Sequence, residues 1–223
     1  MPDAVNHAPK RIAFVHTVGR LVEMFRQMAA RELPEADIFH VLNESLLQDL
    51  LRHGESPAIT RRIVQQAVLA ADAGAALVVF TCSSTSPAID AARPLVSVPI
   101  LKIDDPMAER AVAAGGKIGL VCTASSTVAP SSALLEAHAR AAGRSIAIEP
   151  LLLKEAYDAL FAGDTATHDA IVIEAATAMA PRCDCLMLAQ ASLAHLQEPL
   201  SVQAGVPVLA SPPLLMEKLR ALA

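Results

Sequence analysis

LVVFTCSST, residues 77–85, is the stretch of sequence that decides the fold class. Its four leading residues are apolar without polar alternation, which predicts a strand buried on both faces, as is typical of a parallel sheet. Hydroxyl side chains and then Pro87 follow, and this combination favours the start of a helix. Ligands of open α/β sheets bind beyond the carboxyl ends of the strands. Cys82 therefore lies where we expect chemistry, beside helix N–H groups that favour a thiolate.

The rest of the chain continues this alternation of buried strands with helices. Further apolar runs predict strands at residues 11–17, 38–42, 98–103, 117–123, 145–148, 185–188 and 206–209. Apolar residues at helical spacing predict helices at residues 19–31, 46–51, 57–73, 87–92, 130–142, 165–180 and 213–222. The alternation indicates parallel sheets and an α/β fold.

The two halves of the chain repeat one another. RIAFVHT at residues 11–17 is matched by KIGLVCT at residues 117–123, 106 positions later. Cys82 and Gln190 are 108 positions apart, and each precedes the proline of a V-P-x-L sequence by 17 positions. The matched spacing predicts two pseudo-symmetric lobes, each a parallel sheet flanked by helices, with the active site in the cleft between them.

The expected domain boundaries follow from the repeat. We expect residues 10–105 together with residues 206–223 to form the first α/β lobe, and residues 106–205 to form the second. A chain of 223 residues is long enough for two such units. Residues 1–9 are polar and are expected to form a disordered tail.

Composition excludes several classes of function. A formal net charge of −5, no basic run and 3% aromatic residues argue against nucleic acid as a partner. No uncharged apolar run reaches the roughly 18 residues of a membrane span, and the N-terminus lacks the apolar core of a secretory signal. We therefore expect a cytoplasmic protein with no membrane partner and with reduced cysteines. Its alanine-rich helical surface is compatible with a homodimer.

Three motifs resemble the aspartate/glutamate racemase superfamily, which includes hydantoin racemases, maleate isomerases and arylmalonate decarboxylases. They are TCSS at residues 81–84, KIGLVCTASSTV at residues 117–128 and DCLMLAQASL at residues 184–193. The resemblance covers nearly the whole chain and implies two pseudo-symmetric lobes and no cofactor. It also implies chemistry at the carbon α to a carboxylate, with two opposed cysteines as acid and base.

The chain departs from that pattern at the second cysteine. Cys82 matches the first family cysteine, but Gln190 stands where the second is expected. An amide cannot exchange a proton near neutral pH, so the symmetric two-thiol mechanism is not available. His16 falls where glutamate racemases place an acidic partner of the first cysteine, and Ser192 falls where they carry a histidine. Arylmalonate decarboxylases also keep one cysteine, but theirs matches the other position.

Cys82 and His16 are the predicted catalytic residues. Cys82 would act as a general base on a carbon acid or as a nucleophile. His16 would stabilise the thiolate or relay its proton, although a histidine at a strand end is equally often a plain hydrogen-bonded residue. Cys122, the repeat partner of His16, is either a substitute acid or inert core, and inert core is the more frequent case. Gln190 would hydrogen-bond the substrate, or would only satisfy the backbone of a loop.

Two hydroxyl-rich loops at helix starts are candidate carboxylate sites. Their backbone N–H groups and hydroxyls would hold a carboxylate and stabilise an enediolate, while the alternative is that they are helix caps. Cys183 and Cys185 alternate faces of a strand, which is poor geometry for chelation, and we expect no metal site. The predicted substrate-binding residues are Thr17, Ser83, Ser84, Thr85, Thr123, Ser125, Ser126, Thr127, Gln190, Ala191 and Ser192.

The sequence therefore predicts a cofactor-independent racemase or isomerase that acts on a small carboxylate substrate with a single thiol. A racemase would need His16, Cys122 or water as the second proton carrier. Two alternatives stay open. A decarboxylase, lyase or cis–trans isomerase needs only one sulfur, and a non-catalytic carboxylate-binding protein needs none.

Overall fold

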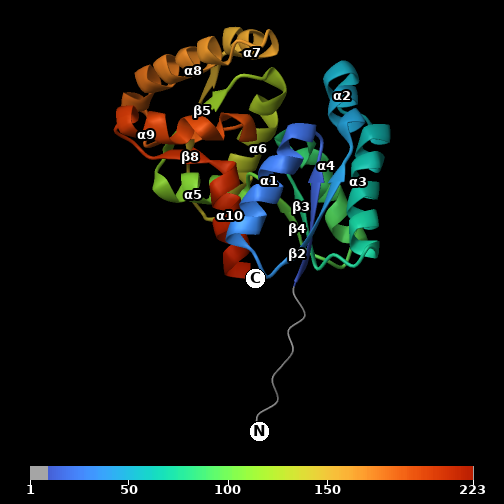
Figure 1. Cartoon of the computed structure of the whole chain (residues 1–223). Coiled ribbons are helices and arrows are strands. Elements are labelled where there is room, and N and C mark those ends of the chain that lie inside the picture. Colours follow the sequence, from blue (N-terminus) through green and yellow to red (C-terminus); the bar gives the residue numbers. More distant parts are fainter. Residues whose placement is uncertain (1–9, 223) are drawn as a thin grey trace. The chain divides into compact units, whose positions relative to one another are not determined.

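The computed structural model describes residues 10–222, which fall into two compact units (Figure 1). Of the described residues, unit 1 comprises 10–102 with 216–222, and unit 2 comprises Ile103–Leu215. The expected tail at residues 1–9 lies outside the described residues. Among residues 10–222, none of the helices combines the length and the apolar character needed to cross a membrane.

Unit 1 is built on a parallel sheet with the strand order β2–β1–β3–β4. Its strands are β1 (Arg11–His16), β2 (Asp37–Leu42), β3 (Leu77–Phe80) and β4 (Ile100–Lys102). The helical segments between them are α1 (Gly19–Glu32), α2 (Glu44–His53), α3 (Pro57–Asp72), η1 (Ser83–Thr85), α4 (Ser86–Ala92) and η2 (Arg93–Leu95). The boundary with unit 2 falls inside α10 (Ser211–Leu222).

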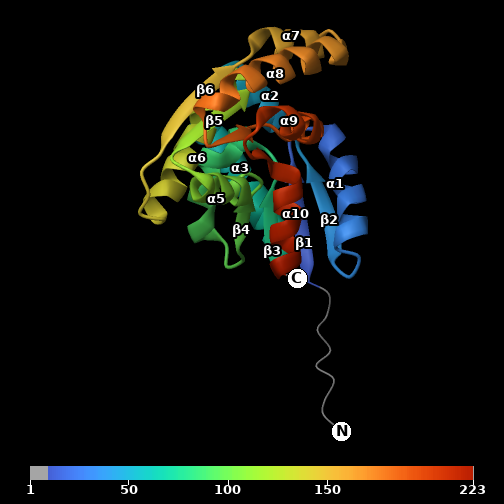
Figure 2. The same ribbon diagram turned by 90° about the vertical axis from the view of Figure 1, so that its left-hand side faces the viewer.

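Helices cover both faces of this sheet. The start of α3 is set by Ser56, whose hydroxyl accepts the N–H of Ile59 at 3.3 Å, with Pro57 in the first turn. The helix buries one face, at Ile59, Ile63, Ala67 and Ala70, in a cluster with Ala13, Val15 and Phe80. Phe14 points to the opposite face and meets Phe25 of α1, with ring centroids 5.4 Å apart. Figures 1 and 2 show α1 beside β2 and away from α3.

Unit 2 repeats the same sheet with the strand order β6–β5–β7–β8. Its strands are β5 (Lys117–Cys122), β6 (Ala147–Leu152), β7 (Cys185–Leu188) and β8 (Val208–Ala210). Its helical segments are α5 (Asp105–Ala114), α6 (Ser125–Ala141), α7 (Lys154–Phe161), α8 (Thr165–Met179), η3 (Ala180–Arg182), η4 (Ala191–Leu196) and α9 (Gln197–Ala204).

The pairing registers of the two sheets are the same. Ile12 lies opposite Leu77 in the first sheet, and Ile118 lies opposite Cys185 in the second. The spacings of 106 and 108 residues seen in the sequence are therefore the spacings of equivalent strands. The predicted α/β class, with two parallel sheets flanked by helices, is confirmed.

The second unit extends further than we expected. We placed residues 206–223 in the first lobe, but β8 hydrogen-bonds to β7, with Leu186 opposite Val208, and unit 2 runs to Leu215. A short apolar strand fits the edge of either sheet, so its sequence does not show which one it joins. Two helices, α7 and α9, were not predicted at all, and α6 begins at its serines rather than at Pro130.

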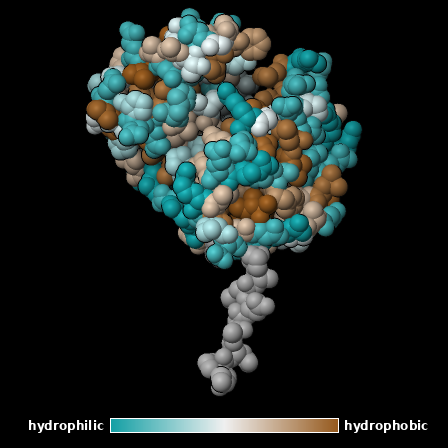
Figure 3. Space-filling model, in the orientation of Figure 1, coloured by the Kyte–Doolittle hydropathy of each residue, from teal (hydrophilic) through white to brown (hydrophobic). Residues whose placement is uncertain are grey.

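Some large apolar side chains of unit 1 are exposed to solvent rather than buried in its core. Leu51, Leu69 and Leu95 are exposed on α2, α3 and η2. The space-filling view accordingly mixes hydrophobic and hydrophilic residues on this unit (Figure 3). Self-association through such helical surface stays a prediction.

Candidate active site

Cys82 lies just beyond the carboxyl end of β3, where the chain turns into η1 and α4. Its carbonyl oxygen accepts the N–H of Thr85 at 3.1 Å and the Thr85 hydroxyl at 2.7 Å, which closes the turn. All four cysteines lie within residues 10–222 and are free thiols. Only Cys82 is partly exposed, because the other three are packed into unit 2. Cys82 is thus the most exposed of the four thiols.

His16, at the end of β1, belongs to a buried chain of hydrogen bonds. Its Nδ1 lies 2.8 Å from the Thr81 hydroxyl, and its Nε2 lies 2.9 Å from Nδ1 of His40. The Thr81 hydroxyl also donates to the carbonyl oxygen of Val15 at 3.2 Å. All groups are satisfied when His40 donates to His16 and His16 donates to Thr81. Both ring nitrogens of His16 are therefore engaged, and neither is left for Cys82.

Burial also keeps His16 uncharged. Desolvation, with the nearby His40 and Arg26 as further causes, lowers the pKa of His16 to about 3. The ring is stacked in the α1 face of the sheet, where no water reaches it. The expected stabilisation of a thiolate by a charged His16 is not supported by this environment. Its hydrogen-bond contact is instead with Thr81, the residue before Cys82.

Gln190 holds a loop of unit 2 through its side-chain oxygen. Oε1 accepts the N–H of Thr123 at 2.6 Å, the Thr123 hydroxyl at 3.1 Å and the N–H of Ala124 at 3.2 Å. Because all three partners are donors, the atom that faces them must be the amide oxygen Oε1 and not the nitrogen Nε2. The loop-satisfying role foreseen for Gln190 is therefore present. Among the described residues, the hydrogen bonds given for its side chain are all made by Oε1.

Cys122, at the end of β5, is buried under α5 and α6. Desolvation, together with the negative charge of Asp104, raises the pKa of Cys122 to about 12. A thiol with this pKa stays protonated at neutral pH. Cys122 is fully buried and has the environment of a core residue, the more frequent of the two cases considered for it.

The hydroxyl-rich loops divide into groups with different roles. Thr127 closes its own turn by donating to the carbonyl oxygen of Ala124 at 2.8 Å, just as Thr85 does in unit 1. The Thr17 hydroxyl is buried and has no hydrogen-bond partner among the described residues. The partly or fully exposed hydroxyls at these strand ends are those of Ser83, Ser84, Ser125, Ser126 and Ser192.

The predicted site residues thus divide into two groups, and each group lies at the carboxyl ends of the strands of one sheet. Unit 1 brings together His16 and Thr17, at the end of β1, with Cys82 and the η1 hydroxyls, after β3. Unit 2 brings together the Thr123 loop and residues 190–192.

Sequence reasoning missed several residues of these edges. It missed His40, because β2 places that ring beside His16 only through the register that pairs Phe14 with His40. It also missed a group of His168, Asp169 and His195 in unit 2.

Comparison with known families gives one match across most of the chain. A family model described as Asp/Glu/Hydantoin racemase matches residues 17–219. No curated protein matches the chain in sequence.

Solved structures share the fold at low sequence identity. A putative Asp/Glu racemase from Yersinia pestis superposes with a TM-score of 0.76 at 16% identity, covering 96% of this chain and 98% of that one. A glutamate racemase isoform from Bacillus anthracis gives 0.70 at 17%, with coverages of 97% and 82%. An allantoin racemase from Klebsiella pneumoniae gives 0.65 at 19%, with coverages of 95% and 88%. At these identities the likeness establishes the fold.

Proposed function

We propose that this chain, which belongs to the Asp/Glu/hydantoin racemase family, is a cofactor-independent enzyme acting at the carbon α to the carboxylate of a small acid. The observation that carries the proposal is the setting of Cys82. It is the only partly exposed thiol and lies at the carboxyl end of a parallel strand, followed by hydroxyl groups and helix N–H groups.

The proposed step is a proton transfer to sulfur. The Cys82 thiolate takes the α proton and becomes a thiol, and the electron pair left on carbon delocalises into the carboxylate as an enediolate. Hydrogen-bond donors are then needed at the enediolate oxygens. The buried Thr17 hydroxyl, unpartnered among the described residues, supports such a role, as do the hydroxyls of Ser83 and Ser84.

The internal repeat supports the proposal that the loop at Thr17 supplies hydrogen-bond donors to the substrate. In unit 2, the backbone and hydroxyl of Thr123 and the N–H of Ala124 converge on Oε1 of Gln190. Thr17 and Cys82 are the repeat partners of Thr123 and Gln190. We propose that in unit 1 the same donor geometry serves a substrate oxygen beside the thiol.

Gln190 and the unit 2 loop have a binding role in this proposal. Nε2 of Gln190 donates to a substrate carboxylate, and the hydroxyls of Ser125, Ser126 and Ser192 add further donors. Gln190 cannot return a proton because an amide does not titrate near neutral pH, and Cys122 cannot reach a substrate because it is fully buried in the core of unit 2. That observation favours a second candidate function, a lyase or cis–trans isomerase that needs only Cys82. For a racemase, water would have to return the proton on the opposite face.

The test is proton NMR in heavy water on a pool of aspartate, glutamate, a hydantoin, maleate and an arylmalonate. The wild type is compared with Cys82→Ala and with Cys183→Ala, a matched control that removes a different thiol. Loss of an α-proton signal in the wild type and the control, but not in Cys82→Ala, supports the proposal. Loss of a maleate or malonate signal supports the lyase or cis–trans isomerase. Exchange that survives in Cys82→Ala, or no turnover with ligand binding intact, contradicts the proposal.

A further inference from the structure

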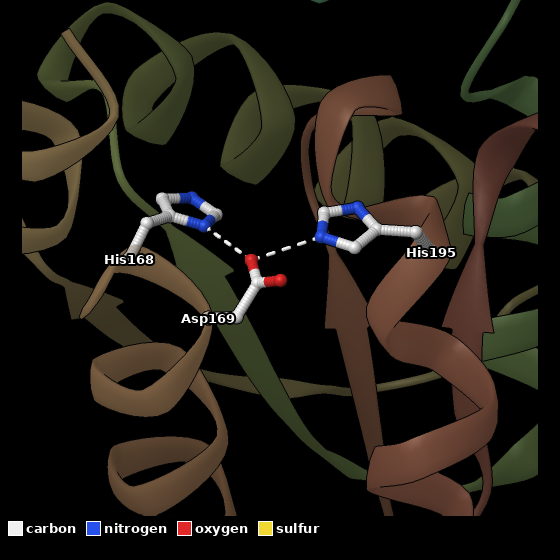
Figure 4. A group of neighbouring side chains, drawn as sticks. All are labelled: His168, Asp169 and His195. Atoms are coloured by element: carbon white, nitrogen blue, oxygen red, sulfur yellow. Dashed lines mark hydrogen bonds and ion pairs between the residues drawn. The ribbon is translucent and has the colours of Figure 1, made fainter. Parts of the chain in front are cut away.

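Two histidines and an aspartate of unit 2 lie together outside the proposed catalytic residues. His168 and Asp169 come from the second turn of α8, whose start is capped by Asp164. His195 comes from η4, the segment that follows β7 and Gln190. Figure 4 shows both imidazole rings directed at the same carboxylate from opposite sides. Residues from two separate segments thus converge on one point.

Asp169 is the centre of the group. Its Oδ1 lies 2.7 Å from Nδ1 of His168 and 2.9 Å from Nε2 of His195. The three atoms all lie within 4.8 Å of one another. Burial raises the pKa of Asp169, but the hydrogen bonds and charges of the two histidines outweigh it and hold the pKa below its usual value. Asp169 is therefore a carboxylate at neutral pH, with negative charge facing both rings.

His195 has an acceptor on each side. Its Nδ1 lies 3.0 Å from the carbonyl oxygen of Ser192, which can only accept, and its Nε2 faces the Asp169 carboxylate. A neutral imidazole carries one N–H group and cannot satisfy two acceptors. A cation bound at Nε2 would leave Nδ1–H to donate to Ser192 and would bridge the ring to the Asp169 carboxylate. A histidine that donates from one nitrogen to a backbone carbonyl while the other binds a metal is a common arrangement in metal sites.

We propose that His168, Asp169 and His195 bind a divalent cation of the zinc class. Two imidazole nitrogens and one carboxylate oxygen are suitable ligands for Zn²⁺, and three protein ligands leave a fourth position for water. Tetrahedral zinc would hold its ligand atoms about 3.3 Å apart. The present contacts of 2.7 and 2.9 Å must therefore open by roughly half an ångström.

The burial of the three side chains is compatible with that adjustment. His168 is fully buried and fixed, whereas the side chain of His195 is 49% exposed and that of Asp169 is 26% exposed. When Nδ1 of His168 binds the cation, the ring proton moves to Nε2, which is buried without a partner among the described residues, so metal binding must outweigh the cost of one unpaired N–H. The cation would link α8 to η4. If the proposed function holds, it would also steady the adjoining residues 190–192.

The test is a binding titration that does not depend on turnover. Chelator-treated protein is titrated with Zn²⁺ by calorimetry and with Co²⁺ by visible absorption, whose intensity reports the ligand geometry. His195→Gln and Asp169→Asn each remove one ligand at a partly exposed position. His53→Gln removes an exposed histidine from the end of α2 and serves as the matched control. Cys82→Ala excludes binding by the exposed thiol.

We expect one equivalent of Zn²⁺ to bind to the wild type, the control and Cys82→Ala with the same affinity. Each ligand variant should bind at least about tenfold more weakly and lose the intense Co²⁺ band. Circular dichroism of the metal-free variants verifies that they are folded. Absence of stoichiometric binding to the wild type, or equal affinity in both ligand variants, would overturn the proposal. Either result leaves the proposed function at Cys82 untouched, since that is measured separately by proton exchange.

Discussion

Replacing Gln190 separates its structural role from its proposed role in binding. Gln190→Ala removes the oxygen that accepts two N–H groups and one hydroxyl from the loop after β5. Gln190→Glu keeps an acceptor at the same place but replaces the NH₂ donor by a second anionic oxygen. The first change should therefore lower stability and the second should not.

The size of the effect follows from how many donors are left without a partner. Thr123 is buried, so its N–H would lose its partner without reaching water, at a cost of about 1–3 kcal/mol. Ala124 is only half-buried, and its N–H can turn to solvent. We expect Gln190→Ala to lower the free energy of unfolding by about 2–3 kcal/mol in total. Gln190→Glu should stay within about 1 kcal/mol of the wild type, since an ionised acceptor strengthens these hydrogen bonds.

The assay is urea unfolding followed by circular dichroism at pH 8, where the new carboxylate is ionised. Proton-exchange or binding assays on the same samples then report the function. Gln190→Glu should be folded but impaired with a carboxylate substrate, because like charges repel. Equal loss of stability in the two variants would refute the argument from the oxygen atom. So would a Gln190→Ala protein as stable as the wild type.

Three further predictions concern pH, packing and thiol reactivity. Because burial lowers the pKa of His16 to about 3, the unfolded chain binds a proton there at higher pH than the folded protein does. Stability should therefore fall by up to about 1.4 kcal/mol per pH unit as the pH drops from about 6.5 towards 3, and His16→Gln should show a shallower fall in urea titrations. A Cβ at Gly119 would lie 2.6 Å from a side-chain carbon of the neighbouring strand, so Gly119→Ala should cost about 1–3 kcal/mol in the same assay; an unchanged midpoint would contradict the packing. In folded protein, iodoacetamide should alkylate Cys82 first, because burial raises the pKa of Cys122 to about 12 and of Cys185 to about 11, and also raises that of Cys183. Earlier modification of any of these three, seen by peptide mass spectrometry, would contradict this.

The repeat could be predicted from sequence because equivalent strands make equivalent hydrogen bonds. The N–H of Thr81 donates to Val15 at 3.0 Å, and the N–H of Ala189 donates to Val121 at 3.0 Å. Any insertion between the strands would have disturbed the spacing without changing these bonds. The spacing was kept to within two residues, so counting along the chain was enough to pair Cys82 with Gln190.

The membership of β8 in the second sheet could not be predicted in that way. Its apolar residues are compatible with any parallel edge, and pairing with β7 is a long-range contact that sequence periodicity does not report. The helices α7 and α9 are each only eight residues long. In segments this short, tertiary packing decides the structure more than helix propensity does.

The sequence by itself determined the α/β class, the two parallel sheets and the position of Cys82 at a strand end. These features could be predicted because buried strands and helices each require a characteristic spacing of apolar residues along the chain. Only the tertiary structure decided where side-chain atoms point. It turned His16 towards Thr81 and His40, engaged the oxygen of Gln190 in its own loop, and brought His195 to Asp169 across 26 positions of sequence. Such contacts depend on rotamers and strand register, which are properties of the packed molecule and have no period along the sequence.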